Sequence, residues 1–186
     1  ERGEDILFVC YDNEIYGNTG GQRSSATPLG ARTTTTDRGK REGKKDILGI
    51  MAAHGIPYAA SVSLAHPEDA LRKMRHALEE RGFRFLHVLS PCPTGWKAEP
   101  ADGVELLRLA VTSGLYPVCE IFDGERWVVN EEPTFDFAAM KRYFSLQGRF
   151  RDGVDLRRVS REVSRHWRKL RSLVAAGEAF EDLASA

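Results

Sequence analysis

The stretch ILFVCYDNEIYGNTGGQ, residues 6–22, joins a short apolar segment to a loop of carboxylates, carboxamides and three glycines. Residues 6–11 form a continuous apolar run, which predicts a strand buried on both faces of a sheet. In parallel α/β sheets, ligands bind just beyond the carboxyl ends of the strands. A polar, glycine-rich loop at that position is typical of a site for phosphate, for a metal ion or for both.

Four polar side chains of this loop are candidate ligands: Asp12, Asn13, Asn18 and Gln22. Oxygen donors suit Mg²⁺ or Ca²⁺, and Mg²⁺ commonly bridges to a phosphate of the ligand. The alternative is a turn whose Asn and Asp side chains satisfy their own backbone. The position directly after a strand favours the binding site.

Strand and helix patterns alternate along the chain as far as Pro133. We expect further strands at 58–64, 83–89 and 116–122, with a turn at 123–126 leading into residues 127–129. Helices are expected at 46–54, 66–81 and 102–113. The alternation predicts an α/β fold with a mostly parallel sheet flanked by helices. Residues 135–144 and 154–176 look helical, so we expect an α/β domain over 1–133 and a helical C-terminal extension over 134–186.

Composition excludes several classes of function. The chain has 186 residues, with 27 basic and 27 acidic side chains, so no global positive field argues for nucleic acid. Its apolar runs are only as long as strands, which argues against a membrane protein. The first residues lack an apolar signal core, and three widely spaced cysteines argue against a disulfide framework. We therefore expect a cytoplasmic protein.

The three cysteines have different contexts. Cys10 and Cys119 lie in apolar strand patterns, where a free cysteine behaves as a small hydrophobe. Cys92 stands between two prolines, which suits a metal ligand, a nucleophile or simple packing in a turn. One cysteine alone cannot complete a zinc or iron–sulfur site. No histidine is marked as its base, and surface or core-edge roles are expected for His54, His66, His76 and His87.

The sequence contains two basic segments, for which structural roles are expected. Residues 38–45 are expected to form a solvated loop, with docking to an acidic partner as the alternative. Residues 157–171 are rich in Arg but carry apolar residues at helical spacing. This pattern indicates a helix that faces the core or a partner, and the zero net charge disfavours nucleic acid.

Three motifs, in this order, resemble the β subunit of 2-oxoacid:ferredoxin oxidoreductases, nearest to the pyruvate type. The segment DNEIYGNTGGQRSSATP (12–28) resembles the thiamine diphosphate loop of that family. SPCPTGW (90–96) resembles a second signature, and LQGRF (146–150) resembles the family's C-terminal ending. The resemblance covers about residues 5–151 and implies a thiamine diphosphate-binding fold that is incomplete at its N-terminus.

The resemblance also implies roles for individual residues. The Asn13 side-chain oxygen and the Ile15 backbone carbonyl would complete the coordination of Mg²⁺, for which such oxygens are suitable ligands. Cys92 would be the fourth ligand of the 4Fe–4S cluster nearest the cofactor. Asn18 would face the thiazolium and the substrate as the catalytic residue, where a carboxamide can hydrogen-bond a developing oxyanion. The implied cofactor-binding set is Asp12, Asn13, Ile15, Asn18, Thr19 and Gln22.

The family reaction is the thiamine-dependent, CoA-dependent oxidative decarboxylation of a 2-oxoacid, here expected to be pyruvate. It gives an acyl-CoA and CO₂, and electrons pass through iron–sulfur clusters to ferredoxin. The implied partners are the α subunit and the other subunits of the oxidoreductase, ferredoxin, the 2-oxoacid and CoA.

The family's Gly-Asp-Gly segment and three other cluster cysteines would precede Ile6, and its activating glutamate lies on a different subunit or domain. We therefore expect the C-terminal half of a β subunit, inactive without its N-terminal half. The alternatives are a thiamine enzyme without a cluster and a non-catalytic interaction module.

Overall fold

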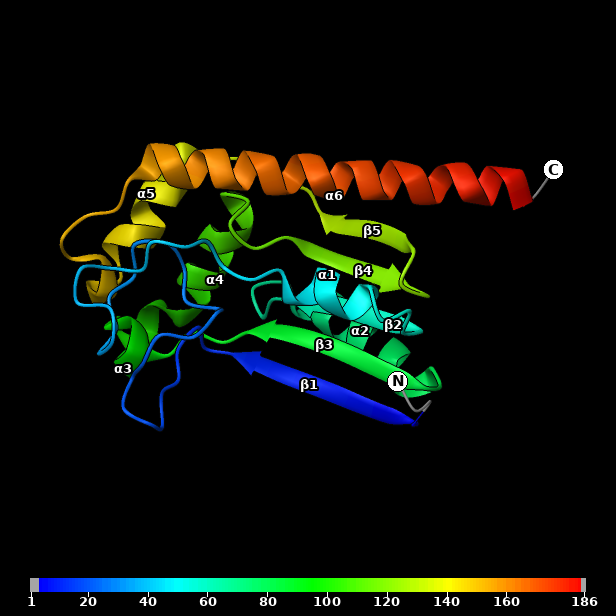
Figure 1. Cartoon of the computed structure of the whole chain (residues 1–186), viewed down its shortest axis with the longest axis horizontal. Coiled ribbons are helices and arrows are strands. Elements are labelled where there is room, and N and C mark those ends of the chain that lie inside the picture. Colours follow the sequence, from blue (N-terminus) through cyan, green and yellow to red (C-terminus); the bar gives the residue numbers. More distant parts are fainter. Residues whose placement is uncertain (1–3, 185–186) are drawn as a thin grey trace.

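The computed structural model describes residues 4–184, so residues 1–3 and 185–186, the outer ends of the two expected domains, lie outside the described residues. Its centre is a five-stranded sheet with the strand order β1-β3-β2-β4-β5 (Figure 1). The strands are β1 (Ile6–Asp12), β2 (Tyr58–Val62), β3 (Phe83–Leu89), β4 (Val118–Phe122) and β5 (Arg126–Glu131). β1, β3 and β2 are parallel, as expected, whereas β4 runs antiparallel to β2 and β5 antiparallel to β4. The sheet is therefore mixed, with an antiparallel hairpin at one end.

The prediction that the first strand is buried on both faces is wrong. β1 lies at the edge of the sheet, and Ile6, Phe8 and Tyr11 are 48%, 52% and 73% exposed. Phe8 stacks on Phe85 of the neighbouring strand β3 at 5.9 Å between ring centroids, yet its side chain stays about half exposed. Cys10 is half-buried, whereas Cys119 is buried in β4 as expected. A continuous apolar run predicts a strand, but it does not specify whether both neighbouring strands are present.

All five long helices were predicted to within a few residues except at the end of the last one. They are α1 (Ile47–Ala52), α2 (Pro67–Glu79), α4 (Gly103–Thr112), α5 (Phe137–Ser145) and α6 (Leu156–Ala184). The sequence did not predict three short elements, α3 (Pro93–Trp96) and the 3₁₀ turns η1 (Pro100–Asp102) and η2 (Gly148–Phe150). A single turn carries no hydrophobic periodicity, so such elements leave no pattern to read. Among the described residues, no helix combines the length and the apolar composition needed to cross a membrane.

Helices cover both faces of the sheet (Figure 1). Alternate strand residues point to opposite faces. Ala60 and Leu86 pack in one cluster with Ala70 and Ala77 of α2. Their neighbours in sequence pack in a second cluster that contains α1 and α6, whose members include Leu48, Ala59, Phe85, Trp167 and Leu170. The sheet is thus sandwiched between α2 on one side and α1 with α6 on the other.

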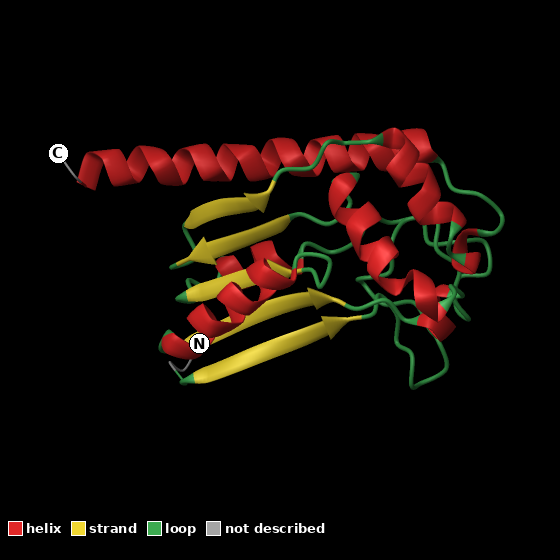
Figure 2. Ribbon diagram, turned by 180° about the vertical axis from the view of Figure 1, so that it is seen from behind, coloured by secondary structure: helices red, strands yellow, loops and turns green. Residues whose placement is uncertain are grey.

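A third cluster fills the end of the molecule where β1 and β3 finish. It combines residues of the loop after β1 with α4, α5 and the first turns of α6, and it includes Leu29, Trp96, Leu106, Phe144 and Val159. Figure 2 shows α6 as a long helix lying along β5. Because α6 contributes to two of the three clusters, the C-terminal extension shares its core with the sheet.

Candidate functional site

The loop after β1 and the cysteine motif after β3 lie at the same end of the sheet, where the carboxyl ends of these two strands are found (Figure 1). The two strands are parallel neighbours in register, with Asp12 opposite Leu89. The Ser90 amide donates to the Asp12 carbonyl at 3.0 Å, which continues the pairing one residue further. The register of β1 and β3 therefore places the first two recognised motifs side by side.

A closed turn forms the tip of the loop. Tyr16 and Gln22 form an isolated antiparallel bridge, and Gly20 and Gly21 adopt φ values of 112° and 76° between them. The Thr19 hydroxyl donates to Gln22 Oε1 at 2.5 Å, and Gln22 Nε2 donates to the Thr19 carbonyl at 2.7 Å. Thr19 and Gln22 thus bind each other, while Asn18 is exposed at the tip.

The backbone carbonyls of the loop are not all satisfied. Those of Asn13, Glu14 and Tyr16 accept hydrogen bonds from Trp96 Nε1 (2.8 Å), Thr27 Oγ1 (2.7 Å) and the Gly21 amide (2.9 Å), respectively. The Ile15 carbonyl between them receives no donor from the residues that the structure describes. Asn13 Oδ1 accepts from the Ile15 amide at 3.2 Å, so the Asn13 side chain is held over the same turn. Two oxygens of the expected Mg²⁺ set therefore lie on one short segment.

The Asp12 carboxylate contacts three groups of the same chain. It accepts from the Glu14 amide at 2.8 Å and lies 2.8 Å from His87 Nε2 and 2.7 Å from Lys44 Nζ. Burial raises the pKa of this carboxyl, but the hydrogen bond with His87 and the charge of Lys44 outweigh it and hold the pKa well below its usual range. Asp12 is therefore ionised, and its oxygens fix the start of the loop.

Glu14 continues the chain of charges. Its carboxylate binds Lys44 Nζ at 3.0 Å and Arg149 Nη2 at 2.6 Å, and it is almost completely buried. Burial lowers the pKa of Lys44, but the charges of Glu14 and Asp12 outweigh it and raise the pKa above its ordinary value. The order Asp12, Lys44, Glu14, Arg149 alternates in sign and sums to zero. We call these four residues the charge chain.

The third recognised motif lies against the second. The Arg149 guanidinium stacks over the Trp96 ring at 4.2 Å, and Arg149 Nε donates to Gln147 Oε1 at 2.8 Å. The Gly148 amide donates to the Lys97 carbonyl at 2.9 Å, and a Cβ on Gly148 would lie 2.9 Å from the Lys97 Cβ. Only a residue without a side chain allows this approach. All three motifs thus meet around Glu14, Trp96 and Arg149.

Cys92 immediately precedes α3 and is its N-cap residue. Its Sγ accepts from the Gly95 amide at 3.3 Å, and its carbonyl accepts from the Trp96 amide at 2.7 Å. The thiol is half-buried. Within the described part of the chain, no group of three or more His, Cys, Asp or Glu side chains is placed to hold a metal ion.

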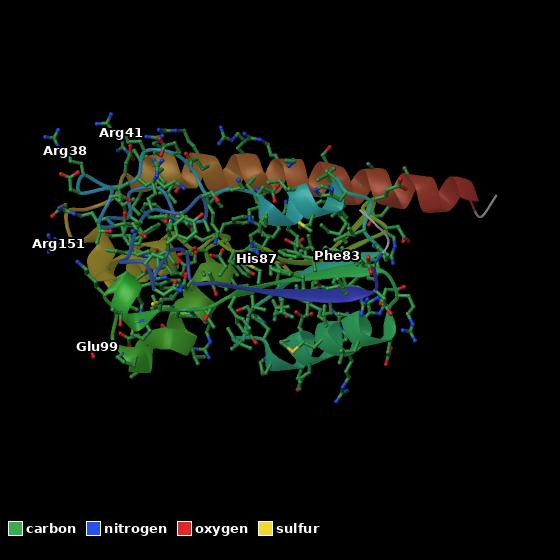
Figure 3. All side chains as sticks on the ribbon, turned by 60° about the horizontal axis from the view of Figure 1, so that its bottom comes forward. Arg38, Arg41, Phe83, His87, Glu99 and Arg151 are labelled. Carbon is green, nitrogen blue, oxygen red and sulfur yellow. The ribbon has the colours of Figure 1, made fainter. Side chains whose placement is uncertain are left out.

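Sequence reasoning missed several residues of the site. His87, expected at the surface or the core edge, is 6% exposed and bonded to Asp12. The solvated interpretation of residues 38–45 is wrong for two lysines, since Lys44 belongs to the charge chain and Lys40 Nζ donates to the Ser25 and Thr27 carbonyls. Arg38 and Arg41 do point into solvent (Figure 3). Membership of a motif was the available signal for Glu14, Trp96 and Arg149, whereas Lys44 and His87 had none.

Comparison with known proteins places the chain among thiamine diphosphate enzymes. Residues 1–88 match the family described as thiamine pyrophosphate enzyme, C-terminal TPP binding domain. The chain is 41% identical over 180 residues to ketoisovalerate oxidoreductase subunit VorB of Pyrococcus abyssi, covering 93% of this chain and 58% of the relative. It is 46% identical over 160 residues to pyruvate synthase subunit PorB of Methanocaldococcus jannaschii, covering 83% and 53%.

A solved 2-oxoglutarate:ferredoxin oxidoreductase from Magnetococcus marinus, with 2-oxoglutarate, coenzyme A and succinyl-CoA bound, matches at 24% identity with a TM-score of 0.49. That match covers 76% of this chain and 53% of the other.

The fold and the loop define a thiamine diphosphate-binding domain. Within that class, the chain belongs to the family of VorB- and PorB-type subunits of 2-oxoacid:ferredoxin oxidoreductases. It spans a little over half the length of these relatives.

Proposed function

We propose that this chain supplies part of the thiamine diphosphate site, and one ligand of an iron–sulfur cluster, in a 2-oxoacid:ferredoxin oxidoreductase. The overall reaction converts a 2-oxoacid and CoA to an acyl-CoA and CO₂, with two electrons passing singly through iron–sulfur clusters to ferredoxin. Thiamine diphosphate would supply the electron sink for decarboxylation, and the cluster would supply a path for electrons toward ferredoxin. Pyruvate is the proposed substrate. The relatives include both a pyruvate synthase subunit and a ketoisovalerate oxidoreductase subunit.

The observation that carries the proposal is the free carbonyl of Ile15. The carbonyls of Asn13, Glu14 and Tyr16 are bound within the chain, whereas that of Ile15 accepts no hydrogen bond from the described residues and can therefore accept a ligand. Together with Asn13 Oδ1 it forms a neutral oxygen pair, which fits Mg²⁺ bound mainly to a diphosphate. We propose Asn13 and Ile15 as Mg²⁺ ligands. Because the charge chain is already neutral, it adds no net charge next to the cation.

The other proposed site residues have different roles. The exposed Asn18 is proposed as the catalytic residue, because its carboxamide is free to hydrogen-bond the reacting carbonyl. Thr19 and Gln22 are proposed to hold the cofactor through the turn that they close. Asp12 is proposed to act on the cofactor indirectly, by fixing Glu14 and the start of the loop.

Cys92 is the proposed cluster ligand. Its half-buried thiol and the amide that donates to its sulfur suit a cluster thiolate, because N–H···S bonds are a feature that tunes such clusters. The chain contains three cysteines, so a 4Fe–4S cluster would need thiolates from elsewhere in the assembly. The proposed partners are the α subunit and the other subunits, the N-terminal half of the β subunit, and ferredoxin. The cytoplasm is the proposed location, because three free cysteines suit a reducing compartment.

Reconstitution of the full-length assembly tests the proposal. Asn13→Ala should weaken thiamine diphosphate and Mg²⁺ binding, and Cys92→Ala should lower the iron content and abolish ferredoxin reduction. Asn130→Ala in β5 and Cys10→Ala in β1 are the matched controls and should leave both properties near wild type. Full activity and normal iron in the Asn13 and Cys92 variants would contradict the site assignment. Cofactor binding without iron would favour a cluster-free thiamine enzyme, and binding of neither would favour an interaction module.

A further inference from the structure

We infer that Trp96 couples the cysteine turn to the diphosphate loop, so that the group held at Cys92 and the diphosphate held at the loop bind cooperatively. This inference rests on the proposed function for the identity of the two groups, and it assigns a positioning role to a residue that contacts neither. It follows from three sets of contacts around one indole ring.

The first set joins the indole to the cysteine. Cys92 and Trp96 are the two ends of a single turn, in which the Trp96 amide donates to the Cys92 carbonyl at 2.7 Å. The Gly95 amide donates to Cys92 Sγ at 3.3 Å. These two hydrogen bonds tie the sulfur and the Trp96 backbone to the same turn.

The second set joins the indole to the loop. Trp96 Nε1 donates to the Asn13 carbonyl at 2.8 Å, which is the backbone of a proposed Mg²⁺ ligand. A second contact lies beside it, because a Cβ on Gly95 would be 3.0 Å from Ile15 Cγ2 and 3.2 Å from Cys92 Sγ. The turn therefore contacts both proposed Mg²⁺ ligands, Asn13 through a hydrogen bond and Ile15 through packing.

The third set prevents the ring from absorbing a displacement. Trp96 is fully buried, with the Arg149 guanidinium 4.2 Å from its ring centre and the Tyr143 ring edge-on at 6.3 Å. Arg149 is itself fixed by Glu14 and Gln147, at 2.6 Å and 2.8 Å. A close-packed ring of this kind transmits a shift instead of rotating away from it.

Cooperativity follows because the positions of the turn and the loop are coupled through these contacts. A cluster bound at Cys92 would fix the position of the turn and hence of Asn13 and Ile15, so the diphosphate would then bind to a loop that is already in place. The same coupling must operate in the reverse direction, because the two binding free energies are linked. We expect a coupling of about fivefold or more, the lower end of the usual range for linked sites.

The test uses the full-length assembly and measures binding, not turnover. Thiamine diphosphate with Mg²⁺ is titrated by calorimetry into the cluster-loaded protein and into protein stripped of iron by an oxidant and a chelator under anaerobic conditions. Wild type should bind the cofactor about fivefold or more weakly after stripping. In Trp96→Phe, which cannot donate to Asn13, the difference between the two dissociation constants should largely disappear. A second readout is the chelator concentration that removes half of the iron, which the cofactor should raise in wild type but not in Trp96→Phe.

Trp167→Phe is the matched control. Trp167 is equally buried, and its Nε1 also donates to a backbone carbonyl, that of Gly114 at 2.9 Å, but it lies on α6. This variant should keep the coupling. Gly95→Ala provides a second variant with the indole intact: its methyl group would press on Ile15 and should raise the dissociation constant of the cofactor.

Equal dissociation constants in loaded and stripped wild type, with both groups binding normally, would overturn the coupling and leave the proposed function standing. Persistence of the coupling in Trp96→Phe would overturn the role of Trp96. A wild-type assembly that binds neither iron nor cofactor would overturn the proposed function itself.

Discussion

Glu14 combines a left-handed backbone conformation with two ion pairs. Its φ of 62° lies in the left-handed region, which costs a residue with a side chain roughly 1 kcal/mol or more. Two ion pairs and the hydrogen bond from Thr27 to its carbonyl hold it there. The turn at Glu14 separates the Asn13 and Ile15 carbonyls, so one is bound by Trp96 and the other is left free. The left-handed turn at Glu14 therefore sets the orientation of the two proposed Mg²⁺ ligands.

Replacing Glu14 by Gln should destabilise the fold by about 3 kcal/mol, because it leaves the buried Arg149 guanidinium without its carboxylate. Urea unfolding followed by circular dichroism measures this difference in the free energy of unfolding. Glu42→Gln is the control, since Glu42 pairs with Arg23 at the surface, where a salt bridge contributes less than about 1 kcal/mol. Equal losses in the two variants would contradict the buried role of Glu14.

Stability should also depend on pH through His87. Burial lowers the pKa of this imidazole below its ordinary value of 6.5, against the opposing hydrogen bond with Asp12, and the neighbouring Lys44 charge acts in the same direction as burial. Because the unfolded chain binds this proton at higher pH than the folded chain, the stability contribution is complete above about pH 6.5 and is lost as the pH falls toward the folded value. The free energy of unfolding should therefore fall less steeply below about pH 6.5 in His87→Gln than in wild type. Identical slopes in the two proteins would exclude His87 as the source.

At the scale of elements, the C-terminal helix α6 belongs to the core. Val159, Trp167 and Leu170 are all buried, and the Trp167 indole donates to the Gly114 carbonyl beyond α4. A Cβ on Gly114, whose φ is 76°, would lie 3.0 Å from Trp167 Nε1. The helix and the α4–β4 connection are therefore fitted to each other at this point.

Leu170→Ala should cost about 2–5 kcal/mol, because it removes a buried side chain between α6 and the sheet. Arg168→Ala, two residues earlier on the exposed face, should change the free energy of unfolding by no more than about 0.5 kcal/mol. Thermal and urea unfolding of the two variants check this contrast. A small loss for Leu170→Ala would show that α6 is dispensable to the core.

The strands and the longer helices could be predicted from the sequence, but the pairing of the strands could not. Helical periodicity and flanking glycines located α2 and α4, and the motifs located the site loop. The antiparallel entry of β4 and the edge position of β1 depend on pairings that no local pattern records. The site shows the same limit, since Glu14 binds Lys44 and Arg149 from 30 and 135 residues away. Residues that act by long-range contact carry no signal at their own position.

At the scale of the whole molecule, the number of cysteines limits whether the chain can hold a 4Fe–4S cluster by itself. A 4Fe–4S cluster normally takes four protein ligands, and the chain has three cysteines, of which Cys119 is buried in β4. Burial raises the pKa of the Cys119 thiol to about 11, which makes it a poor thiolate near neutral pH.

Anaerobic reconstitution of this chain by itself should therefore give far fewer than four iron atoms per chain, measured by iron assay and by the visible absorption of the cluster. The full-length assembly should load fully, and its Cys119→Ala variant should load as well as wild type. A complete cluster on the isolated chain would contradict the shared ligand set.

The edge position of β1 has a consequence for the dynamics of the site. A strand with one neighbour leaves a row of its own N–H groups without partners in the sheet, so these exchange with solvent deuterium without any opening of the fold. Peptides from residues 6–12 should take up deuterium sooner than those from the central β3, residues 83–89. The strand that leads into the loop at residues 13–22 is thus the least protected part of the parallel sheet. Any chain that paired with its free edge would slow that exchange and stabilise the loop beyond it.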